Sequence, residues 1–157
     1  MTHRRSITLA VFLAACQQAQ PSPPASSSPF KPAATNKELM NEVIEPAADV
    51  YWDAVGSVTD KHGTVERTPK TDDEWKAVRN AAMVIAESGN LLMIEPRAPD
   101  RDQWMKLARG LVEAGQRARA AAESKNRTAV FDAGAEVYDA CVACHSKYMP
   151  GVVNPAR

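Results

Sequence analysis

Apolar residues recur at intervals of three and four between residues 36 and 56, a spacing that places side chains on one face of an α-helix. They are Leu39, Met40, Val43, Ile44, Ala47, Val50, Tyr51, Ala54 and Val55. Thr35 or Asn36 is the expected N-cap, and the helix should end near Gly56. Pro46 lies inside this pattern. Because proline removes a helical hydrogen bond and clashes with the preceding turn, we expect a kink or a break there.

Two more amphipathic helices are predicted in the middle of the chain. Residues 71–74, with the sequence TDDE, form a capping box that begins a helix ending between Gly89 and Met93. Asp100 should begin the next helix, with Gln103 at the reciprocal capping position. The residues expected to face inward are Trp75, Val78, Ala82, Ile85 and Ala86 in the first of these helices, and Trp104, Leu107, Ala108, Leu111 and Val112 in the second.

A fourth helix should start near Arg127 or Thr128 and continue toward the C-terminus. Its apolar and motif residues are Val130, Phe131, Gly134, Val137, Tyr138, Cys141, Cys144 and His145. Residues 57–70 contain Gly, Pro and mixed charges, which indicates a surface connection, and no alternating run of β-formers is long enough to predict a strand. Four helices with short connections favour an all-α fold, an antiparallel four-helix bundle.

The first fifteen residues have the pattern of an export signal. Arg4 and Arg5 precede an apolar run, Ile7 to Ala15, that is too short to span a bilayer as a helix. The letters LAA before Cys16 resemble the bacterial lipobox, in which the cysteine is lipidated and becomes the mature N-terminus. Residues 1–15 are therefore predicted to be a lipoprotein signal peptide. The alternative is an ordinary signal cleaved nearby, with an incidental cysteine.

Residues 16–35 follow as a predicted tether. After Cys16 they consist almost entirely of Gln, Pro, Ser and Ala, which cannot bury enough apolar area to fold. Residues 36–157 are then the folded domain. Lipidation would hold it on the periplasmic side of a membrane, with Gln17 slightly favouring the outer membrane. Removal of the signal leaves 17 basic and 19 acidic residues. This balance excludes a strongly basic protein that binds nucleic acid through its charge.

Cys141, Cys144 and His145 form a C-x-x-C-H motif. Because a helix turns by about 100° per residue, the three side chains share one face and can contact one flat object. This is the attachment motif of c-type haem, in which both thiols form thioethers and the imidazole ligates the iron. A thioredoxin-like motif would need a βαβ setting, and a zinc site would need further ligands. The sequence predicts one covalent haem c and no disulfide.

With this motif near its C-terminus on the last of four helices, the chain resembles the class II c-type cytochromes, the cytochrome c′ group, over residues 36–148. The resemblance implies a haem within the bundle near one end, with His145 as proximal ligand. In that family, the first helix covers the distal face of the haem. Met40 is the matching ligand, and Leu39 is the neighbour that would leave the site merely apolar. The alternative is that Met40 is a core residue.

Four further residues concern the surroundings of the haem. Family members often carry an arginine one turn before the distal residue, near a haem propionate, where this chain has Asn36; Lys37 is a substitute. Tyr148 lies on the same face as Cys141, either against the haem edge or as an aromatic cap of the bundle end. His62, in a polar segment, should be a solvated surface residue.

A His/Met haem suits a reversible one-electron carrier rather than an enzyme. The leading function is therefore a lipid-anchored electron carrier that exchanges electrons with membrane or periplasmic redox proteins. A five-coordinate protein that binds carbon monoxide or handles nitric oxide is the alternative. A peroxidase would need a distal acid–base group, for which Met40 has only Asn36, Lys37, Glu38 and Asn41 nearby. Some relatives form homodimers, and the sequence leaves that state open.

Overall fold

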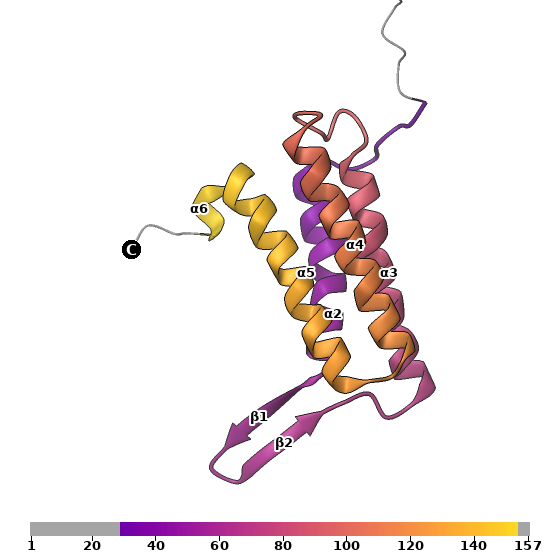
Figure 1. The fold of residues 1–157 in the computed structure, drawn as a ribbon, viewed down its shortest axis with the longest axis vertical. Helices are drawn as coiled ribbons and strands as arrows, with labels where there is room; N and C mark the ends of the chain where they lie inside the picture. Colours follow the sequence, from indigo (N-terminus) through magenta and orange to yellow (C-terminus); the bar gives the residue numbers. More distant parts are fainter. Residues whose placement is uncertain (1–28, 154–157) are drawn as a thin grey trace, which may run out of the picture.

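The computed structural model describes residues 29–153, which are mostly helical with one small sheet. The elements are α1 (Asn36–Leu39), η1 (Met40–Ile44), α2 (Glu45–Asp53), β1 (Gly56–Asp60), β2 (Gly63–Arg67), α3 (Asp72–Leu92), α4 (Gln103–Glu123), α5 (Arg127–Tyr148) and α6 (Pro150–Val153). Figure 1 shows α2, α3, α4 and α5 side by side, with the chain reversing direction from each to the next. No helix within 29–153 is both long enough and apolar enough to cross a bilayer. The predicted signal peptide, Cys16 and most of the predicted tether lie outside the described residues.

The first helical segment is continuous from Asn36 to Asp53 but changes its winding on the way. Thr35 caps it as predicted: its hydroxyl accepts the N–H of Glu38 at 3.2 Å, and the Glu38 carboxylate accepts the N–H of Thr35 at 2.8 Å. The stretch η1 is a π-helix, in which the N–H of Glu45 donates to the carbonyl of Met40. Because Pro46 has no N–H for the preceding turn, the backbone widens just before it. The irregularity expected at Pro46 thus takes the form of this π-helical turn.

The prediction of no strands is wrong, because residues 56–67 form a hairpin. β1 and β2 pair antiparallel, with Val58 opposite Val65 and a 2.9 Å hydrogen bond between the hydroxyls of Thr59 and Thr64. Both valines are exposed, at 55% and 68%, so the strands lack the buried alternation by which a strand is usually found. The available signal was β-branched residues on both sides of a two-residue turn. His62 is exposed in that turn, as predicted.

The predicted start is correct for one of the two middle helices and too early for the other. The capping box of α3 is confirmed: the Thr71 hydroxyl accepts the N–H of Glu74 at 3.2 Å, and the Glu74 carboxylate accepts the N–H of Thr71. For α4 the predicted start at Asp100 is too early, since the helix begins at Gln103. The Asp100 carboxylate does accept the N–H of Trp104 at 2.9 Å, but it does so from the loop before the helix.

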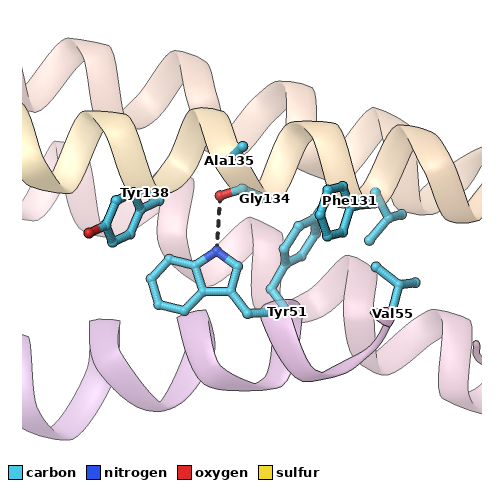
Figure 2. A pocket seen from close by; sticks show the side chains of 8 residues that line it. Tyr51, Val55, Phe131, Gly134, Ala135 and Tyr138 are labelled. Carbon is cyan, nitrogen blue, oxygen red and sulfur yellow. Dashed lines mark hydrogen bonds between the residues drawn. The ribbon is translucent and has the colours of Figure 1, made fainter. Parts of the chain in front are cut away.

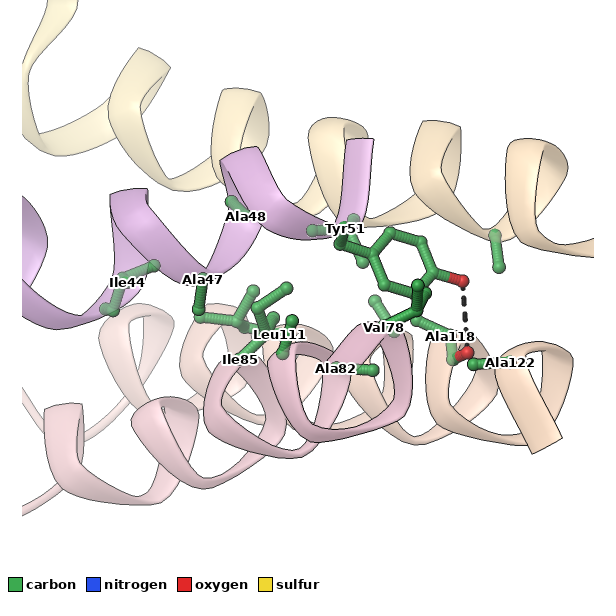
Figure 3. Packing of buried hydrophobic residues seen from close by; sticks show 14 of the residues in the cluster. Ile44, Ala47, Ala48, Tyr51, Val78, Ala82, Ile85, Leu111, Ala118 and Ala122 are labelled. Carbon is green, nitrogen blue, oxygen red and sulfur yellow. Dashed lines mark hydrogen bonds between the residues drawn. The ribbon is translucent and has the colours of Figure 1, made fainter. Parts of the chain in front are cut away.

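The core lies between the long helices and is rich in alanine (Figure 3). All the inward residues predicted for α3 are buried, and Tyr51 is fully buried with its hydroxyl donating to the carbonyl of Ala118 at 3.0 Å. Helices α3 and α4 approach closely at Gly115, where an added Cβ would lie 2.6 Å from the backbone nitrogen of Ala86. The first helix and α5 pack against this closely packed pair of helices.

Candidate functional site

Helix α5 carries the C-x-x-C-H motif in its last two turns. The helix begins with Asn126 as cap, whose side-chain oxygen accepts the N–H of Ala129 at 3.0 Å. Cys141, Cys144 and His145 are all half-buried, and both cysteines are free thiols. The motif therefore lies on a helix face between core and surface, where its three side chains remain accessible to a bound group.

The packing of α5 changes along its length. Its buried residues are Val130, Ala133, Gly134 and Val137, and residues 138–148 contain none. Yet this last stretch includes apolar side chains that the core covers only in part: Ala140, Cys141, Cys144 and Tyr148. Figure 1 shows the same end of α5 leaning away from the other helices. The end of the helix that carries the motif thus presents apolar surface with incomplete cover from the protein.

The surroundings of the two thiols favour their protonated form. Burial raises the pKa of Cys144, and burial together with the neighbouring Cys144 raises the pKa of Cys141. A disulfide oxidoreductase needs the opposite, a thiolate with a lowered pKa at a helix N-terminus or beside a cation. These two cysteines lie near the C-terminal end of a helix, where the dipole disfavours negative charge. Their surroundings therefore disfavour the thiolate that redox exchange requires.

Met40 lies at the same end of the molecule as the motif, because the first helix starts where α5 ends (Figure 1). It is the first residue of η1 and is half-buried, whereas its neighbour Leu39 is 2% exposed within the core. Of the two, Met40 is thus the side chain at the border between core and surface. Its ligation of a metal stays a prediction.

Tyr148 ties the end of α5 to the loop before α4. Its hydroxyl donates to the carboxylate of Asp100, and its ring meets that of Trp104 edge-on, with centroids 4.9 Å apart. Trp104 is itself held by a 2.7 Å hydrogen bond from its indole N–H to the carbonyl of Leu92. Of the two predictions for Tyr148, the aromatic cap of the helix end is therefore confirmed. The contact fixes the backbone three residues after His145.

Sequence reasoning missed Arg97, which lies in the loop between α3 and α4. This residue contacts the start of the first helix and is only 8% exposed. Its guanidinium donates to the carbonyls of Ala34 and Leu91, each at 3.0 Å, and its own carbonyl accepts from the Asn36 side chain at 2.9 Å. No carboxylate pairs with it among the described residues, and the side-chain oxygen of Asn36 is buried without a partner. The cation beside Asn36 thus comes from a loop distant in sequence, which no local pattern could indicate.

Comparison of the chain with protein-family models, with curated proteins and with solved structures gives no match in any of the three. Within residues 29–153, no three His, Cys, Asp or Glu side chains come together as a metal-binding group.

Proposed function

We propose that this chain is a mono-haem c-type cytochrome of the class II kind, an antiparallel four-helix bundle that carries one-electron equivalents. The observation that supports it most is the coincidence of two features on α5. The C-x-x-C-H motif falls in the stretch 138–148, which has apolar side chains and no buried residue. A flat, largely apolar group attached there would cover this surface and hold the helix end against the first helix.

Each residue of the site has a role in this proposal. Cys141 and Cys144 would hold the haem through thioethers, and the His145 imidazole would ligate its iron. When bound, haem supplies a reversible one-electron couple. The thioether of Met40 is the second ligand, and it raises the potential because soft sulfur favours the reduced iron. The guanidinium of Arg97, which lies beside Asn36, would be the cation for a propionate in place of Lys37.

The residues around the motif hold it in position. Tyr148, through Asp100 and Trp104, fixes the backbone directly after His145. A fixed helix end would hold the His145 imidazole in position to bind the iron. This function agrees with the predicted lipid anchor at Cys16, which would keep the carrier on the periplasmic side of a membrane and near its redox partners.

The test of the second ligand is the absorption spectrum of the purified haem protein, oxidised and then reduced with and without carbon monoxide. Wild-type protein should be low-spin with a thioether-to-iron band, and Met40→Ala should abolish that band and bind carbon monoxide when reduced. Met105→Ala, which removes another partly buried methionine from α4, is the control and should keep the wild-type spectrum.

The second candidate function is a five-coordinate gas-binding protein. The observation that favours it is the apolar character of the first helix around Met40, with Leu39 buried and Val43 packed at the edge of the core. If wild-type protein is high-spin and takes up carbon monoxide as readily as Met40→Ala does, Met40 is a packing residue and this function replaces the carrier.

A further inference from the structure

An apolar groove runs between α2 and α5, along residues 130–138 of α5 (Figure 2). Its volume is about 310 Å³, and its walls include Trp52, Val55, Phe131, Gly134, Ala135 and Tyr138. Phe131 and Tyr138 are 62% and 57% exposed. Exposed aromatic rings on one helix face are a common feature of protein interfaces, where they bury large rigid areas at low entropy cost.

The groove is held in shape by contacts between its two helices. The indole N–H of Trp52 donates to the carbonyl of Gly134 at 2.9 Å, and the Tyr138 ring meets the Trp52 ring edge-on, with centroids 6.3 Å apart. Gly134 permits this approach, since an added Cβ there would lie 3.2 Å from the Trp52 ring. A surface already fixed in this way loses little conformational entropy when a partner binds.

The stretches of helix beside the groove carry an excess of acidic residues, with Arg127 and Lys147 at the two ends of α5. Residues 38–53 contain five carboxylates and no Lys or Arg, and residues 128–146 contain three carboxylates and again no Lys or Arg. Of these eight acids, only Asp53 and Glu136 form ion pairs in the part of the chain that the structure describes. The long helices α3 and α4 are balanced, since their six basic residues are matched by an equal number of acidic ones in the same two helices. A chain with no net charge thus has an acidic side.

Helical spacing places unpaired carboxylates along both borders of the groove. Asp49 precedes Trp52 by three residues, and Asp132 and Asp139 lie three before and four after Ala135. Residues at these intervals are neighbours on a helix surface. All three acids are exposed, so their charge is available to a partner that covers the apolar centre.

The groove also leads directly to the motif. Tyr138 lies one helical turn before Cys141 and two turns before His145, on the same side of α5, and one turn is about 5 Å along the axis.

We propose that this groove is the docking surface for a basic, lysine-rich redox protein. The proposal rests on the proposed cytochrome function. In the docked complex the reduced partner would give one electron to a haem held by Cys141, Cys144 and His145, with no bond formed or broken.

The charge of the groove favours such a partner over a second copy of this chain. A symmetric dimer through the groove would place the acidic borders of two copies against each other, and like charges across an interface weaken association. Lysine side chains of a partner would instead meet Asp49, Asp132 and Asp139, while an apolar side chain enters between Phe131 and Tyr138. Charge complementarity of this kind speeds encounter and fixes orientation.

The test measures binding of the full-length, haem-loaded protein to a lysine-rich mono-haem cytochrome c by calorimetry, at ionic strengths of about 0.02 M and about 0.3 M. The double variant Asp132→Asn/Asp139→Asn should raise Kd about 10-fold at low salt and much less at high salt. Phe131→Ala should raise Kd about 5-fold at both salt concentrations. The matched control Glu87→Gln/Glu113→Gln removes two exposed charges from α3 and α4, and Kd should change less than about 2-fold.

Two results would overturn the docking proposal: equal Kd values for the acidic double variant and its control, or groove variants that dissociate a dimer and leave the affinity for the probe unchanged. Sedimentation of the same samples detects the second. The proposed cytochrome function fails separately, through a visible spectrum without covalent haem, because binding of the probe is measured without electron transfer.

Discussion

Tyr148 and Asp100 form the hydrogen bond that fixes the helix end after the candidate haem ligand. Burial and this bond raise the pKa of Tyr148 to about 12, and the same bond with the N–H of Trp104 lowers the pKa of Asp100. An unfolded tyrosine titrates near pH 10. Because the folded pKa is the higher one, the stability due to the Tyr148 proton is complete below about pH 10 and is lost as the pH rises through about 12.

The pH dependence of thermal unfolding tests this assignment. Tyr148→Phe should melt at a lower temperature than wild type at pH 8, and the difference between the two proteins should shrink as the pH rises from about 10 to about 12. It should also shrink in acid, as Asp100 becomes protonated and its lowered pKa no longer favours folding. Tyr138→Phe, at an exposed ring whose hydroxyl forms no hydrogen bond in residues 29–153, is the control. A difference that stays constant with pH would contradict the assignment.

Arg97 is a buried cation that donates to backbone carbonyls and has no acidic partner in the described chain. If it lies beside a haem propionate, its positive charge disfavours the ferric state, and Arg97→Gln should lower the reduction potential. Arg109→Gln, at an exposed position of α4, should leave the potential unchanged. Spectroelectrochemical titration of both variants measures this, and equal potentials would mean that Arg97 serves only to hold Ala34 and Leu91.

Among the elements, α3 and α4 depend on a close approach at one glycine. A Cβ at Gly115 would meet backbone atoms of Ala86 at 2.6 and 2.7 Å, whereas one at Gly110 would meet nothing within 4 Å. Gly115→Ala should therefore lower the free energy of unfolding by about 2 kcal/mol through overpacking. Gly110→Ala should raise it by up to about 1 kcal/mol, because alanine favours the helix. Urea unfolding of both variants checks this, and equal effects would show that α3 and α4 can separate freely.

The elements also show what local sequence could predict. Helix caps are short-range features, so the capping box at Thr71 was predicted correctly and Thr35 was one of the two caps predicted for the first helix. The hairpin at residues 56–67 was missed because its valines are exposed and its strands have no buried face. The start of α4 was predicted at Asp100 because Asp100 and Gln103 have the spacing of a helix cap. In the structure the Asp100 carboxylate accepts the N–H of Trp104, but the helix begins only at Gln103.

On the scale of the whole molecule, the C-x-x-C-H motif is local in sequence, so its helix and its face followed from spacing alone. The surroundings of the motif depend on residues far apart in the chain. Arg97 contacts Asn36, the first residue of the first helix, from 61 positions away, and Asp100 contacts Tyr148 from 48. The acidic side of the molecule is readable in the sequence, but the groove that it borders requires the packing of Trp52 against Gly134. Contacts of this range come from tertiary structure and have no sequence pattern.

The most direct test of the account is the visible spectrum of the protein after extraction with acidified acetone, which removes haem that is not covalently bound. Wild-type protein, expressed with its export signal in a host that matures c-type cytochromes, should keep one haem per chain. Cys141→Ala/Cys144→Ala should lose its haem completely. A wild-type chain that is colourless after extraction, with both thiols open to alkylation, would contradict the assignment of Cys141, Cys144 and His145 as a haem site.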